Sequence, residues 1–297
     1  MKRIIALLIL LGLVGTASAS TIAYWRFEDG TAGTEHPGDQ DDWYLDSSGN
    51  GNHLSSWWDQ SRPMATTDRP FTAVPQTGAA NNLALDFDNG TGGTEGADDL
   101  GTFGNGGGKM VESYNFVNGW TMEASFKARD LDHWQVFMGK DGKRGLGAEQ
   151  PFSFKLAPSA ESFGIRTLFL DNNDDFHFID SAPIAVDTWY SIAATYDNTD
   201  FKVYLKGEAD ADYILIGSHA TSVGGDLGVL NSGTWTVGRG MWDGNPVDFF
   251  NGQIDEVRIS DTALNPSEFI AIPEPATLGL FGLIGGGMLW IRRRIKR

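Results

Sequence analysis

The sequence predicts an all-β fold in which two antiparallel sheets pack face to face as a sandwich. Apolar residues alternate with polar residues through many short segments, as half-buried strands require. Turns rich in Gly, Asp and Asn separate these segments, and the central chain shows no helical pattern longer than two turns. All-β sandwiches of ~200 to 250 residues commonly form one unit, so residues 20–270 are expected to be a single domain.

The expected strands follow one another in chain order. Residues 21–27 open the domain, and residues 30–52 form a loop whose acidic side chains we expect to be mostly solvated. A strand at 83–87 precedes residues 88–109, which are rich in glycine and predict a long insertion loop. Further strands are expected at 120–126, 134–138, 152–156, 165–170, 176–179, 189–196, 201–205, 213–216 and 235–237.

The last expected strand, residues 252–259, contains an irregularity. Val257 and Ile259 share one face, but Ile254 would lie on the opposite face of a regular strand. This pattern predicts a bulge, or an entry from a turn at Gly252, just before Asp255, whose side chain would be redirected there. Residues 265–268, Asn-Pro-Ser-Glu, then have the pattern of a short capped helical turn that closes the domain near residue 270.

Five segments, at 23–28, 46–52, 120–124, 189–206 and 252–268, resemble in sequence and order the laminin-G-like, concanavalin-A-like jelly-roll domains of bacterial surface proteins. The resemblance covers residues 22–270 and implies an antiparallel jelly-roll β-sandwich. It also implies one structural Ca²⁺ where the first and last strands meet, held by Glu28, Asp255 and backbone carbonyls of residues 46–52. Two alternatives remain open: Asp255 could pair with Arg258 or cap a turn, and Glu28 could be solvated.

Both ends of the chain have the composition of export signals. Lys2 and Arg3, an apolar run at 4–14 and an Ala-Ser-Ala site at 17–19 predict a signal peptide over residues 1–19. The C-terminal segment, residues 271–297, contains the Pro273-Glu274-Pro275 motif, an apolar stretch at 276–291 and the Arg292-Arg293-Arg294 cluster. It resembles the PEP-CTERM sorting signal, which an exosortase-type membrane protease processes, and an ordinary tail anchor is the alternative.

The apolar stretch at 276–291 is short for a transmembrane helix. Its 16 residues would extend about 24 Å, against a hydrocarbon core of ~30 Å. Basic residues after the stretch would place the C-terminus in the cytoplasm and the domain outside. We therefore expect an exported protein, at the cell surface or extracellular, that contacts the membrane only through this segment.

The domain itself is strongly acidic. The signal peptide and the C-terminal segment together hold seven of the 22 Lys and Arg residues and one of the 39 Asp and Glu residues, which leaves 15 against 38, a net charge of −23. Such a charge repels phosphate backbones, so nucleic-acid binding is not expected. The chain has no cysteine and forms no disulfide.

Few residues have the spacing of a catalytic or metal site. Five histidines are scattered without an i, i+4 pair, so no zinc site is expected. The acidic run at 171–175 lacks the glycine and the final Glu of a calcium-binding loop and favours a hairpin turn. Jelly-roll glycosidases of the laminarinase type use a Glu-x-Asp-x-x-Glu triplet, which is absent; of the strands that could host it, one offers Glu123 alone.

The ten tryptophans divide into two expected groups. Alternation places Trp25, Trp120, Trp189 and Trp235 in the core. The possible glycan-contact residues are Trp57, Trp58, Trp134 and Trp242. We therefore expect a non-catalytic binding or adhesion module for a glycan, an exopolysaccharide or a surface protein; the alternative is a glycoside hydrolase-like enzyme of the concanavalin-A-like group.

Overall fold

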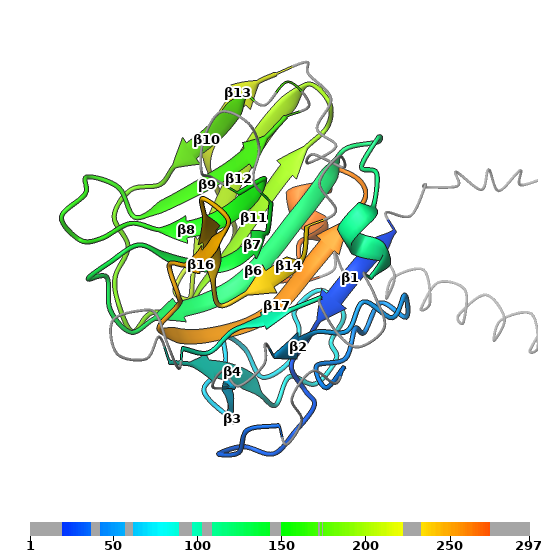
Figure 1. The fold of residues 1–297 in the computed structure, drawn as a ribbon, viewed down its shortest axis with the longest axis vertical. Helices are drawn as coiled ribbons and strands as arrows, with labels where there is room; N and C mark the ends of the chain where they lie inside the picture. The colour runs from blue at the N-terminus through cyan, green and yellow to red at the C-terminus, as the bar shows by residue number, and fades with distance from the viewer. Residues whose placement is uncertain are drawn as a thin grey trace, which may run out of the picture.

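The computed structural model describes residues 20–36, 42–56, 62–88, 97–102, 109–142, 150–171, 173, 175–221 and 233–273. These residues form two antiparallel sheets that pack as a sandwich (Figure 1), together with a small hairpin. Two short 3₁₀ helices, η1 (Met110–Ser113) and η2 (Pro266–Glu268), are the only helical turns in the described chain. The all-β prediction is confirmed.

The larger sheet has eight strands in the order β13-β12-β11-β6-β17-β4-β3, with β1 paired to the second half of β17. Its strands are β1 (Thr21–Trp25), β3 (Met64–Thr66), β4 (Ala84–Phe87), β6 (Trp120–Ala128), β11 (Tyr190–Tyr196), β12 (Asp200–Gly207), β13 (Ile214–Ala220) and β17 (Gly252–Ser260). The first and last strands of the domain are therefore neighbours.

The smaller sheet has seven strands in the order β10-β9-β8-β7-β14-β5-β2. They are β2 (Ser55–Ser56), β5 (Leu100–Gly101), β7 (Gln135–Lys140), β8 (Phe152–Leu156), β9 (Ile165–Leu170), β10 (Phe176–Asp180) and β14 (Trp235–Val237). A separate hairpin pairs β15 (Gly240–Trp242) with β16 (Asn245–Val247). Strand β5 lies within the segment expected to be an uninterrupted insertion loop, so that expectation was wrong in part.

Aromatic side chains fill the space between the two sheets. The ring of Trp120, on β6, meets Phe152 and Phe169 of the opposite sheet edge-on, with centroids 5.8 and 5.4 Å away. Such edge-to-face pairs add to the free energy gained by burying the rings. All four tryptophans expected in the core are at most 5% exposed, which confirms that alternation identified them correctly.

Strand β17 contains the predicted bulge. Its register against β6 shifts between Asp255 and Arg258, and Glu256 has a positive φ of 51°. The extra residue allows Ile254 and Val257 both to face the core, as the irregular pattern required. The closing turn also forms as expected, because the Glu268 carboxylate accepts a hydrogen bond from the Asn265 backbone N–H at 2.8 Å.

The expectation of solvated acids in the 30–52 loop fails at Asp46, which is only 6% exposed. Its carboxylate accepts hydrogen bonds from the backbone of Tyr24, Ser48 and Asn52, at 2.8–2.9 Å. This carboxylate therefore fixes the turn against β1. The expected signal peptide and nearly all of the expected C-terminal sorting segment lie outside the described residues; within those residues, no helix is long and apolar enough to cross a membrane.

Candidate ligand-binding cleft

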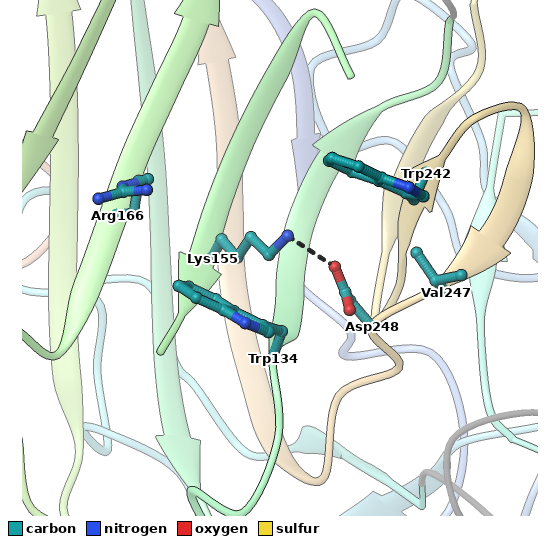
Figure 2. Close-up of a pocket in the computed structure, with 6 residues that line it drawn as sticks. All are labelled: Trp134, Lys155, Arg166, Trp242, Val247 and Asp248. Carbon is teal, nitrogen blue, oxygen red and sulfur yellow. Dashed lines mark ion pairs between the residues drawn. The ribbon is translucent and has the colours of Figure 1, made fainter. Parts of the chain in front are cut away.

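A cleft of about 440 Å³ opens on the outer face of the seven-stranded sheet. Its lining residues come from the sheet and from the β15–β16 hairpin, and they are Trp134, Lys155, Arg166, Trp242, Val247 and Asp248. Figure 2 shows the two indole rings on opposite sides of the cleft with the Lys155–Asp248 pair between them. The volume lies within the ~300–1,000 Å³ typical of ligand pockets.

Strand alternation explains the floor of the cleft. On β8, Phe154 and Leu156 point into the core, so Lys155 between them points outward. On β9, Ile165 points into the core and Arg166 points outward. The register of the two strands places Lys155 directly opposite Arg166, so two cationic side chains lie side by side on the outer face.

The β15–β16 hairpin supplies the other wall. Its turn residues, Asp243 and Gly244, both have positive φ, 48° and 80°, as a two-residue turn matched to the strand twist requires. The hairpin lies close to β7, because a Cβ atom at Gly240 would stand 2.8 Å from Cγ2 of Val136. Only glycine allows this approach, which brings the half-exposed Trp242 beside the sheet.

Each cation in the cleft has a carboxylate partner. Nζ of Lys155 lies 2.8 Å from Oδ2 of Asp248 and 4.9 Å from the centroid of the Trp134 ring. Arg166 donates two hydrogen bonds of 2.8 Å to Asp180. Its guanidinium also lies 4.5 Å from the Phe178 ring centroid. The cleft therefore presents donors and acceptors without a large local excess of either charge.

The lining offers no pair of catalytic carboxyl groups among the described residues. Glycosidic cleavage normally uses two carboxyl groups ~5 to 9.5 Å apart, whereas Asp248 is the single carboxylate among the lining side chains. Glu123 is not placed to act as a catalytic carboxyl group, because it is buried on β6 and accepts hydrogen bonds from Arg258 and the Ile270 N–H. This arrangement favours binding over cleavage.

The structure brings together two of the four tryptophans that the sequence suggested as glycan contacts, Trp134 and Trp242. Trp57 and Trp58 lie outside the described residues. Of the sorting motif, only Pro273 is described, at the exposed end of the domain; Glu274, Pro275, Arg292, Arg293 and Arg294 are not.

The second predicted site, at Asp255 and Glu28, lies where the ends of β1 and β4 approach β17. Asp255 is fully buried, and Oδ2 accepts a 2.8 Å hydrogen bond from Nδ2 of Asn81. Burial, and next the negative charge of Glu256, raise the pKa of Asp255 well above its ordinary value. The Glu28 carboxylate accepts hydrogen bonds from the backbone N–H groups of Asn82 and Leu83 at 2.7 and 3.2 Å.

Two neighbouring contacts concern the alternatives that the sequence left open for Asp255 and Glu28. Arg258 pairs with Glu123, and Glu28 is engaged by the 81–83 segment. Within the described residues, Asp255 makes one turn-like bond: its Oδ1 accepts from the backbone N–H of Glu256 at 2.9 Å.

The donor set around Asp255 suits a hard cation in chemistry. Oδ1 of Asn81 is a buried amide oxygen that has no hydrogen-bond partner among the described residues, and oxygen ligands of this kind are what Ca²⁺ selects. The 46–52 turn, whose carbonyls were expected to complete the site, bonds to β1: Nδ2 of Asn50 donates to the Ile22 carbonyl, and the Asn52 carbonyl accepts from Nε1 of Trp25. No three His, Asp or Glu side chains converge as metal ligands in the described part of the chain.

Comparison with known proteins gives a family and a fold. A family profile described as the concanavalin A-like lectin/glucanases superfamily matches residues 103–269, more than half of the chain. Domain 4 of AbnA, a GH43 extracellular arabinanase from Geobacillus stearothermophilus solved with arabinotriose, is similar in structure. It has 17% identity and a TM-score of 0.50, and the match covers 85% of this chain and 97% of that one.

The binding domain of botulinum neurotoxin DC, solved in complex with rat synaptotagmin II, is also similar. The identity is 12% and the TM-score 0.53, over 85% of this chain and 50% of that one. At such identities the two likenesses concern the fold alone. No curated protein matches the sequence.

Proposed function

Because the chain belongs to the concanavalin A-like lectin/glucanases superfamily, we propose that its domain is a non-catalytic module that binds glycan in the cleft between Trp134 and Trp242. The observation that carries this proposal is the placing of two partly exposed indole rings on opposite sides of one cleft, with a lysine–aspartate pair between them.

This arrangement matches the two kinds of surface that a sugar ring has. The C–H groups on a sugar face carry small positive charges and are attracted to the negative face of an aromatic ring. The hydroxyl groups at the ring edge need donors and acceptors, which Lys155 and Asp248 supply. Because the lysine and the arginine of the cleft are both paired with carboxylates, an uncharged glycan is the ligand class favoured.

A glycoside hydrolase of the same superfamily is the competing candidate. The single, ion-paired carboxylate among the described lining residues speaks against it, since cleavage would need a second carboxyl group across the bond. A glycan array probed with the purified protein, run beside an assay of reducing-sugar release, separates the two. We expect retention of a glycan without sugar release; sustained release that disappears when one carboxylate is replaced would contradict the proposal.

The proposal includes one structural Ca²⁺ at Asp255. Its protein ligands would be Asp255, the amide oxygen of Asn81 and Glu28, completed by water. A divalent cation there would neutralise a buried carboxylate that lies within electrostatic range of two others, Glu256 and Glu28. It would also tie the end of β1 and the entry to β4 onto β17.

The proposal places the module outside the cell. The support is the sequence pattern at the two ends of the chain: a signal peptide at 1–19 and a PEP-CTERM-like segment at 271–297, for processing by an exosortase-type protease. The net charge of −23 between these segments suits a soluble module that contacts the membrane only through the C-terminal segment. Fractionation of cells that express a tagged protein tests this placement.

A further inference from the structure

The free edges of the two sheets come together at β10 and β13. A Cβ atom at Gly217 of β13 would stand 2.6 Å from Cγ2 of Ile179 on β10, so glycine allows the strands to lie this close. His177 shares a strand face with Ile179, and His219 shares one with Gly217. The contact therefore brings the two histidines together, with ring centroids 5.3 Å apart. Figure 1 shows these two strands side by side at one end of the sandwich.

The protonation of His177 follows from its partner. Nε2 lies 2.7 Å from Oδ2 of Asp171, and an ionised carboxylate can only accept, so Nε2 carries the proton. Asp171 is itself held in place, because Oδ1 accepts bonds from the backbone N–H groups of Asn173 and Asp175 at 2.8 and 3.1 Å. The stacked ring of Phe169, 4.8 Å away, fixes the imidazole from one side.

In the neutral imidazole, the second nitrogen of His177, Nδ1, would carry a lone pair that a ligand could use. His177 is only 8% exposed, and its buried Nδ1 has no hydrogen-bond partner among the residues that the structure describes. A buried polar atom of this kind ordinarily has a ligand or partner, because leaving it unsatisfied is unfavourable. The His219 ring stands next to this ring and is itself exposed to solvent.

We propose that His177 and His219 bind a divalent transition-metal ion, of which Zn²⁺ is the redox-inert representative. Imidazole nitrogen is a preferred ligand of Zn²⁺, Ni²⁺ and Cu²⁺. An imidazole that donates its other N–H to a carboxylate, as His177 does to Asp171, is the usual arrangement of a metal-binding histidine. Two imidazoles would leave the remaining positions to water, so the site binds less tightly than a four-ligand structural site.

Metal bound there would join the two sheets at their open edge. His177 lies on β10, an edge strand of the seven-stranded sheet, and His219 lies on β13, an edge strand of the eight-stranded sheet. Because the ion would bind the folded pairing and not the unfolded chain, it would raise the melting temperature. The site is independent of the glycan cleft and of the Asp255 site.

Isothermal titration of the purified, chelator-treated protein with Zn²⁺ tests the proposal, with thermal melts as a second readout. We expect one Zn²⁺ per chain, a melting temperature raised by several degrees, and loss of both effects in His219→Ala, whose exposed side chain can be removed without unfolding the core. Asp171→Asn should weaken binding by about 10- to 100-fold, as loss of a carboxylate behind a metal-bound histidine does.

Two controls separate this pair from other Zn²⁺ binding. His133→Ala removes a histidine elsewhere and should keep the full effect, as should Glu161→Gln, which replaces an exposed acid outside every site described. Zn²⁺ binding that is absent from the unmodified protein, or that His219→Ala leaves unchanged, would overturn the proposal. Imidazole nitrogen NMR adds a direct check, because the Nδ1 resonance of His177 should move on addition of Zn²⁺.

Discussion

Arg258 of β17 donates from Nε to Oε2 of Glu123 on β6 at 2.7 Å, across the centre of the larger sheet. The Glu123 side chain is about 2% exposed and that of Arg258 about 12%, so the pair is largely removed from water. This pairing commits the one basic residue of β17 to Glu123. Asp255, three positions earlier, accepts its hydrogen bonds from Nδ2 of Asn81 and from the backbone N–H of Glu256.

Breaking the Glu123–Arg258 pair from one side should be severe. Arg258→Met leaves the Glu123 carboxylate buried without its cation, and loss of one partner of a buried pair typically destabilises by about 3–5 kcal/mol. The double variant Glu123→Gln with Arg258→Met should recover much of the loss, because the amide still accepts from the Ile270 N–H. Urea denaturation measures both, and equal stability of the single and double variants would contradict this role.

Asp255→Asn should change the response to calcium. In excess chelator at pH 8 the variant should be more stable than the unmodified protein, because it removes a buried carboxyl whose pKa burial has raised. Millimolar Ca²⁺ over a micromolar dissociation constant should stabilise the unmodified protein by about 4 kcal/mol and leave the variant unaffected. Glu161→Gln, an exposed acid elsewhere, is the control and should respond as the unmodified protein does. If chelator does not change the melting temperature of the unmodified protein, the calcium site at Asp255 is contradicted.

Asp98 should make stability depend on pH in a definite direction. Burial raises the pKa of Asp98 to about 7, and Oδ1 of its carboxyl has no hydrogen-bond partner in the described part of the chain. The folded protein thus keeps a proton that the unfolded chain releases near pH 4. The stabilisation that this bound proton provides is fully present below about pH 4 and is lost as the pH rises through 7. Asp98→Asn should flatten the fall in unfolding free energy between pH 5 and 8. A variant whose slope over this range equals that of the unmodified protein would show that Asp98 does not titrate as expected.

Trp134→Ala and Trp242→Ala should each weaken glycan binding by roughly 5- to 30-fold, if each ring supplies about 1–2 kcal/mol of stacking. Both side chains are at least partly exposed, so the fold should tolerate the changes. Trp43→Ala is the matched control, because Trp43 is 37% exposed and stacks on His36 outside the cleft. Titration with the glycan found on the array gives the affinities. An equal loss in all three variants would mean that the cleft is not the binding site.

The long strands could be predicted from the sequence because their alternation is local. The irregularity beside Asp255 was also predictable, since Ile254 and Val257 could not both face the core in a regular strand. Strands β2, β3 and β5 have two or three residues each, too few to show a period. Their pairing depends on contacts with strands distant in the sequence: β2 with β5, and β5 with β14.

The candidate sites were harder to predict than the strands, because they depend on distant contacts. Trp134 and Trp242 were each suggested singly, but their common cleft requires the β15–β16 hairpin, whose Asp243-Gly244 turn signal is short and followed by Pro246. Asn81 gave no signal in the sequence; its contact with Asp255 spans 174 residues. The neighbourhood of His177 and His219 depends on which sheet edges meet, which residue spacing does not encode.

The pairing of β17 with β6 on one side and with β1 and β4 on the other has a mechanical consequence. Force applied along the chain beyond β17 would load this central strand parallel to its neighbours, in shear. The cross-strand hydrogen bonds lie perpendicular to that pull, so they must break together instead of one after another. If the module holds a polymer in its cleft and is tethered through the chain that follows β17, tension falls on β17, which has hydrogen-bonded neighbours along both edges.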